Sequence, residues 1–166
     1  MKMIRVAILF GTLAVFLYLI NSGIASSERN IAEGLPAYLE LAPVDPRSLI
    51  QGDYMTLSYA VERDIRNSDV DYEDRGQVVL TLDENQVATF ESFYEEGQTL
   101  EANQVVVNYK ARNAWRVQVG VDSFFFQEGQ AEDYEIAEYA EVRILEGGGV
   151  MLINLADENL QTINPQ

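Results

Sequence analysis

The sequence predicts a mainly β (α+β) fold, in which an N-terminal transmembrane helix precedes an antiparallel β-rich domain with one short helix. Three observations lead to this fold class. An uncharged apolar run opens the 166-residue chain. Short segments of alternating apolar and polar residues fill most of the remaining chain, as in half-buried strands. Turn residues separate pairs of these segments, as in hairpins. A small barrel or a sandwich fits such a series of short strands.

The apolar run Val6–Ala25 is long enough to cross a bilayer, because about 20 helical residues span the ~30 Å hydrocarbon core. Lys2 and Arg5 precede it, which predicts a cytoplasmic N-terminus and an extracytoplasmic, periplasmic remainder. An uncleaved signal anchor is one interpretation; a signal peptide cleaved after Ala25 is the other. We expect an anchor at residues 1–27, a connector at 28–36 and one β-rich domain at 37–166.

Charge and composition exclude several classes of function. The formal net charge is -16, and all 27 Asp and Glu residues come after the apolar run. A chain this acidic repels nucleic acid, so no nucleic-acid partner is expected. His and Cys are both absent, which excludes His-dependent triads, Cys nucleophiles and thiolate metal sites. We therefore expect no cofactor.

The first part of the β-rich domain contains two predicted strands. Ala37–Ala42 alternates and is ended by Pro43, and Asp53–Arg63 alternates over its whole length. In the second strand Tyr59 shares an apolar face with Met55, Leu57 and Val61 and is expected in the core, whereas Tyr54 lies on the opposite, more polar face. A turn is predicted at Val44–Gln51 between the two strands.

Three hairpins and one helix complete the prediction. Asp83–Asn85, Arg112–Asn113 and Gly147–Gly149 are the turn signals. The flanking strands are Gln77–Leu82 with Gln86–Phe93, Gln104–Lys110 with Arg116–Val121, and Glu141–Leu145 with Val150–Leu155. A soluble helix is predicted at Gln130–Ala140, a helical turn at Asp157–Asn164, and an acidic loop at Asp64–Gly76.

Two segments resemble the GDYXXLXY protein family. Gly52-Asp53-Tyr54-x-x-Leu57-x-Tyr59 reads as the motif that names the family, after a lead-in at Pro43–Arg47. A second segment, Ser123–Gly129, resembles the family's later block. The resemblance implies a bacterial protein with an N-terminal membrane segment, whose gene often adjoins genes for polytopic membrane proteins. It implies no reaction.

The residues of these segments have a functional and a structural interpretation. A recognition surface is the functional one, because Arg47 between carboxylates offers planar donors to a partner. The structural one is a turn held by backbone hydrogen bonds and aromatic packing. The interaction candidates are Asp45, Arg47, Gly52, Asp53, Tyr54 and Glu128; the structural motif residues are Pro43, Pro46, Leu57, Tyr59, Phe124, Phe125, Phe126 and Gly129. The three phenylalanines are expected on a strand buried on both faces, or alternatively in an aromatic docking patch.

Two further chemistries are weakly suggested. Asp69, Asp71, Glu73 and Asp74 are weak candidates for a calcium site, but the EF-hand pattern fails, and a solvated loop is the simpler interpretation. A hydrolase would need a Ser–Lys pair such as Ser48 and Lys110, or paired carboxylates.

We expect a non-catalytic accessory subunit that binds a polytopic membrane protein and contacts the lipid bilayer through residues 6–25. An extracytoplasmic cation- or ligand-binding module is the alternative, and a hydrolase is a third.

Overall fold

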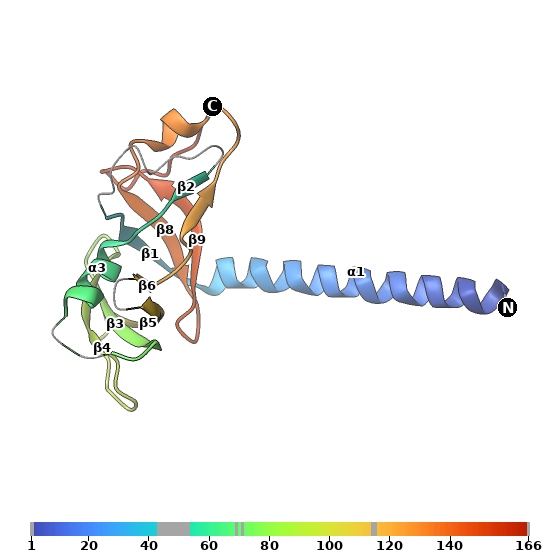
Figure 1. Ribbon diagram of the computed structural model, residues 1–166, viewed down its shortest axis with the longest axis horizontal. Helices are drawn as coiled ribbons and strands as arrows, with labels where there is room; N and C mark the ends of the chain where they lie inside the picture. The colour runs from blue at the N-terminus through green and yellow to red at the C-terminus, as the bar shows by residue number, and fades with distance from the viewer. Residues whose placement is uncertain (1, 43–53, 69, 71, 114–115, 166) are drawn as a thin grey trace. The chain divides into compact units, whose positions relative to one another are not determined.

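The computed structural model describes residues 2–42, 54–68, 70, 72–113 and 116–165 (Figure 1). The chain divides into two compact units after Gly34. The first is a single helix, and the second, from Leu35 onward, is the β-domain.

Helix α1 runs from Lys2 to Glu33. Its segment Leu9–Glu33 is long and apolar enough to cross a membrane by length and composition. The polar side chains of Asn21 and Ser22 donate to the helix's own carbonyls at Leu17 and Leu19, at 2.9 and 3.1 Å. Bonds of this kind satisfy donors that would otherwise lack partners in lipid. The predicted N-terminal apolar helix is confirmed.

The β-domain is built on a seven-stranded sheet with the order β6-β5-β3-β4-β1-β8-β9. Every neighbouring pair is antiparallel except β1 and β4, which run parallel. The bounds are Leu35–Glu40 for β1, Arg75–Leu82 for β3, Val87–Phe93 for β4, Gln104–Asn113 for β5, Arg116–Gln118 for β6, Tyr139–Ile144 for β8 and Val150–Ala156 for β9.

The three predicted hairpin pairings, β3–β4, β5–β6 and β8–β9, are confirmed. The turn predicted at Arg112–Asn113 is wrong, because these two residues are the last of β5. In the first turn the Asp83 carboxylate accepts the N–H groups of Asn85 and Val87, each at 2.8 Å. This side-chain bonding explains why an Asp at the start of the loop predicts the turn.

The sheet curls so that the β8–β9 turn reaches the edge of β5. Asn108 of β5 donates its backbone N–H to the carbonyl of Gly148 at 2.8 Å, and its side-chain amide to the carbonyl of Gly147 at 2.8 Å. Gly148 has φ +83°, and a Cβ there would lie 3.1 Å from the Asn108 side chain. The mostly antiparallel, curled sheet confirms the predicted fold class.

A second, two-stranded sheet pairs β2 (Tyr54–Thr56) with β7 (Ser123–Phe125). The predicted strand Asp53–Arg63 is therefore wrong beyond Thr56, because helix α3 occupies Ala60–Asn67. Val61 and Ile65, four residues apart, are both buried and form a helical apolar face. The burial expected of Tyr59 is nevertheless confirmed, since only 1% of it is exposed.

The helix predicted at Gln130–Ala140 is also wrong. A single 3₁₀ turn, Ala131–Tyr134, forms there, and the segment's last two residues belong to β8. Tyr134 is the only residue of the 3₁₀ turn that is buried, and its ring packs against Phe124 and Phe126 at centroid distances of 4.9 and 5.5 Å. Tyr134 has no apolar residue four positions later, since Glu138 stands there. A helix through this segment would therefore have no continuous apolar face to bury.

The predicted helical turn at Asp157–Asn164 is instead a tight loop, followed by an irregular segment. Asp157 accepts the N–H groups of Asn159 and Gln161, both at 2.9 Å, and Thr162 forms a bridge with Ala156. The Asp side chain thus closes a loop that returns the chain to the edge of β9.

Candidate functional site

Residues Leu57 to Tyr59 form a corner between β2 and α3. Burial and two hydrogen bonds hold this corner in place. Leu57 and Tyr59 are 5% and 1% exposed. The backbone N–H of Leu57 donates to the carbonyl of Asp122 at 2.9 Å, and the Tyr59 hydroxyl donates to the carbonyl of Val121 at 2.9 Å. These two bonds attach the corner to the segment that joins β6 and β7.

Glu62 is the only buried charged side chain in the described part of the chain, with 6% of its surface exposed. One carboxylate oxygen accepts the N–H of Tyr59 at 3.3 Å, and the other accepts the N–H of Val119 at 2.8 Å. Glu62 lies in the first turn of α3, where a carboxylate satisfies N–H groups that have no helical partner. It therefore connects the motif corner to the bend just after β6.

Burial is the main cause that raises the pKa of Glu62 above its ordinary value. The hydrogen bonds from Val119 and Tyr59 and the charge of Arg66 act in the opposite direction, and Asp122 adds to the rise. Burial, then the charges of Glu62 and Asp122, also raises the pKa of Tyr59. The Tyr59 hydroxyl thus stays protonated and serves as a donor.

A polar pocket of about 280 Å³ opens beside this corner. Its charged side chains come from two elements and a loop: α3 contributes Glu62 and Arg66, β6 contributes Arg116, and Asp122 lies in the loop after β6. Arg116 and Asp122 form an ion pair at 3.3 Å, with both side chains well exposed. The remaining lining residues are Thr56, Leu57, Ser58, Val117 and Gln118.

The pocket presents two guanidinium groups and two carboxylates within one concave surface. Such a set suits a ligand that carries a positive and a negative group. A simple anion fits less well, because Glu62 and Asp122 would repel it. Sequence reasoning missed all four charged residues. The one available signal was a Glu three residues after Tyr59, a spacing typical of a helix N-terminus.

The two motif segments meet at an aromatic pair. Tyr54 of β2 lies opposite Phe125 of β7, with ring centroids 5.8 Å apart. Tyr54 is half-buried, whereas Phe125 is 73% exposed. The expectation that the Phe124–Phe126 strand is buried on both faces is therefore wrong, because among the described strands β7 pairs with β2 alone and the Phe125 ring is exposed.

The other described candidates lie apart from the pocket. Glu128 is exposed, and Gly129 has φ +90°, a conformation that suits glycine. Glu73 and Asp74 are exposed. Lys110 is exposed on β5. Among the described residues no group of three His, Cys, Asp or Glu side chains is arranged to hold a metal ion.

The rest of the sequence-based candidates fall outside the described residues. They are Pro43, Asp45, Pro46, Arg47, Ser48, Gly52, Asp53, Asp69 and Asp71.

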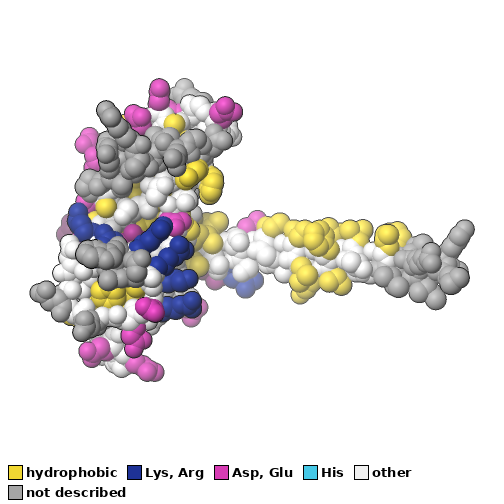
Figure 2. Space-filling model, in the orientation of Figure 1, with side chains coloured by type: hydrophobic (Ala, Val, Ile, Leu, Met, Phe, Trp, Pro, Cys, Tyr) yellow, Lys and Arg dark blue, Asp and Glu magenta, His cyan; other side chains and the backbone are white. Residues whose placement is uncertain are grey.

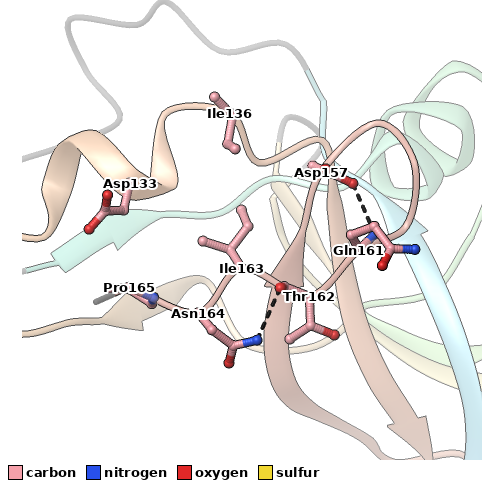
Figure 3. Close-up of a pocket in the computed structure, with 8 residues that line it drawn as sticks. All are labelled: Asp133, Ile136, Asp157, Gln161, Thr162, Ile163, Asn164 and Pro165. Atoms are coloured by element: carbon pink, nitrogen blue, oxygen red, sulfur yellow. Dashed lines mark hydrogen bonds between the residues drawn. The ribbon is translucent and has the colours of Figure 1, made fainter.

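A larger cavity, of about 500 Å³, lies near the C-terminus (Figure 3). Its polar groups are engaged locally: Asp157 accepts the backbone N–H of Gln161 at 2.9 Å, and the Asn164 amide donates to the carbonyl of Thr162 at 3.2 Å. Ile136, 62% exposed, and Asp133 line its other side. These contacts close a terminal loop and bring no charged cluster together, so the pocket beside the motif corner is the stronger candidate site.

Comparison with known proteins places the chain in a family. The GDYXXLXY protein family matches residues 16–155, which is most of the chain and includes both aromatic segments and the motif corner. No curated protein matches. No solved structure matches either. The chain belongs to the GDYXXLXY protein family.

Proposed function

We propose that this protein is a non-catalytic interaction subunit of the bacterial envelope that binds a polytopic membrane protein. In this proposal α1 is an uncleaved signal anchor with a cytoplasmic N-terminus, and the β-domain is extracytoplasmic. The apolar helix and the two basic residues before it support the anchor and its orientation.

The exposed aromatic ring of Phe125 is the observation that carries the proposal. A ring 73% exposed leaves a large apolar area in water, and exposed aromatics beside polar rims are typical anchors of protein interfaces. Its cross-strand neighbour Tyr54 belongs to the motif that names the family. We therefore place the docking surface on the β2–β7 ribbon, centred on Phe125 and Tyr54.

The test is in-cell crosslinking of the tagged full-length protein, then purification and mass spectrometry. Wild type should enrich one polytopic membrane protein, and Phe125→Ala should lose it. Ile136→Ala, which removes another exposed apolar side chain at 62% exposure, is the matched control and should retain it. Arg47→Ala, measured beside them, tests the part of the predicted surface at residues 45–53. Equal enrichment in Phe125→Ala and wild type would refute the docking surface.

A ligand-binding module is the second candidate function, and the charged pocket favours it. Its mixed charges suit a small zwitterion. Calorimetry of the full-length protein in detergent, with glycine and inorganic phosphate as probes, tests this function. Heat with glycine that disappears in Arg66→Ala would support it; no heat with either probe would count against it.

A further inference from the structure

The basic side chains of this acidic protein gather on one side of the β-domain. Every described Lys or Arg from Leu35 onward, except Arg143, belongs to α3, β3, β5 or β6. Figure 2 shows Lys and Arg side chains side by side over β5 and β6, with acidic side chains mainly elsewhere on the β-domain. The gathering contrasts with a formal net charge of -16 for the whole chain.

The sheet register explains this arrangement. Arg75 of β3 pairs with Lys110 of β5, and Lys110 pairs with Gln118 of β6. Residues directly opposite in antiparallel strands point to the same face, as do residues two apart in one strand. Arg75, Lys110, Arg112 and Arg116 are all exposed, whereas the intervening Tyr109, Ala111 and Val117 are buried. We call the four exposed residues the basic face.

Three of the four charges on this face have no ion-pair partner among the described residues. Arg116 pairs with Asp122 at 3.3 Å. Arg75, Lys110 and Arg112 form no ion pair with any other residue that the structure describes. Guanidinium groups, which make up most of the face, bind phosphate in a planar, bidentate geometry.

The basic face is connected to the start of the β-domain through the β8–β9 turn. Leu35, the first residue of β1, pairs with Ile144 at the end of β8. The turn after β8 bonds to Asn108, two residues before Lys110, through Gly147 and Gly148. The face therefore belongs to the part of the domain around the point where the chain leaves α1.

The length of α1 brings this part of the chain to the membrane surface. The apolar run Val6–Ala25 is long enough to span the ~30 Å hydrocarbon core. The remaining helical residues, 26–33, add ~12 Å beyond it at ~1.5 Å per residue. Strand β1 begins at Leu35, so only Gly34 separates it from the end of the helix. The β-domain therefore begins just beyond the headgroup layer, whose thickness on each side is ~5–8 Å.

We propose that the basic face binds the phosphates of anionic lipid headgroups and so orients the β-domain on the bilayer. This proposal rests on α1 crossing the membrane and requires no protein partner. Acidic residues more than ~8 Å away are largely screened at physiological ionic strength, whereas Asp74, next to Arg75 in the chain, and Asp122, which pairs with Arg116, lower the net charge of the face. Each basic residue near an anionic surface contributes roughly a fivefold gain in binding.

The test uses the full-length protein in nanodiscs that contain no other protein. The chain has no cysteine, so a single Cys in place of Gln118 places a fluorophore on the basic face. A Cys in place of Glu158, just after β9 at the other end of the strand order, carries the comparison label. Nitroxide-headgroup lipids quench a fluorophore that lies at the phosphate level.

We expect the label at residue 118 to be quenched in discs with one third phosphatidylglycerol, and much less in pure phosphatidylcholine. Quenching should fall when salt is raised from 0.1 M to 1 M, because the Debye length drops from ~10 Å to ~3 Å. The double variant Arg75→Gln/Lys110→Gln should weaken docking ~25-fold. Arg63→Gln removes an exposed Arg on α3, outside the basic face, and is the matched control that should leave docking unchanged. Near-UV circular dichroism checks that each variant is folded.

Equal quenching in both lipid mixtures would overturn the proposal. The proposal would also be overturned if Arg63→Gln lost as much docking as the double variant, or if the label at residue 158 were quenched as strongly as the label at residue 118. A basic face that stays unquenched in anionic nanodiscs but crosslinks to a protein in native membranes would instead assign it to a protein partner.

Discussion

Replacing Glu62 with Gln tests whether a buried carboxylate holds the motif corner in place. The carboxylate accepts one N–H on each oxygen, at 3.3 Å from Tyr59 and 2.8 Å from Val119. A glutamine keeps the size of the side chain but replaces one acceptor oxygen with an NH₂ donor. One of the two backbone N–H groups then faces another donor in a site that is 6% exposed.

A buried donor left without an acceptor costs about 1–3 kcal/mol. The substitution also removes a charge whose burial is unfavourable, and this offsets part of the loss at neutral pH. The pKa of Glu62 is raised above its ordinary value of 4.5, so its contribution to stability is fully present below pH 4.5 and is lost as the pH rises through the native pKa. The variant's deficit should therefore be larger at pH 5 than at pH 8.

The assay is urea unfolding of the full-length protein in mild detergent, monitored by near-UV circular dichroism at both pH values. Glu84→Gln, in an exposed turn, is the matched control and should behave as wild type. A Glu62→Gln protein as stable as wild type at both pH values, or one whose deficit grows toward pH 8, would refute the reasoning.

Three further predictions concern stability and use the same unfolding assay. Leu57→Ala should lose about 2–5 kcal/mol, because it leaves a cavity at a position only 5% exposed; an unchanged midpoint would mean that the corner is not packed. Tyr59→Phe keeps the buried ring but removes its 2.9 Å bond to a backbone carbonyl, so it should lose about 0.5–1.5 kcal/mol. Gly148→Ala should cost about 1–3 kcal/mol and more than Gly147→Ala, since both have positive φ but only Gly148 would bring its Cβ to 3.1 Å from Asn108; equal losses would contradict the close contact between the turn and β5.

The hairpins could be predicted from the sequence because their signals are local. Asp83 and the three glycines at 147–149 determine turns through their own backbone bonding and conformational freedom. The apolar face of Met55, Leu57 and Tyr59 was also predicted, and all three are buried. The alternation of apolar and polar residues therefore predicted which side chains are buried, even though β2 ends at Thr56.

The errors arose where tertiary packing outweighs the local pattern. Ala60 to Asn67 becomes a helix because Val61 and Ile65 find a buried face and Glu62 reaches Val119, a contact between residues far apart in sequence. The segment around Tyr134 has helix-forming composition but is held by two phenylalanine rings instead. The charged pocket could not be predicted because its members come from α3, β6 and the loop after it.

The central position of β1 has a consequence for how the protein is made. In the sheet, β1 lies between β4 and β8. Its antiparallel partner β8 is the next-to-last strand of the chain, so β8 is synthesised only when most of the domain has already been made. Pairing between such distant segments is slow, because the intervening loop must be closed first. Ala37 and Leu39, fully buried in the finished sheet, therefore stay uncovered until late in synthesis. The domain therefore stays unfolded for longer during synthesis than one whose first strand pairs with its neighbour in the chain.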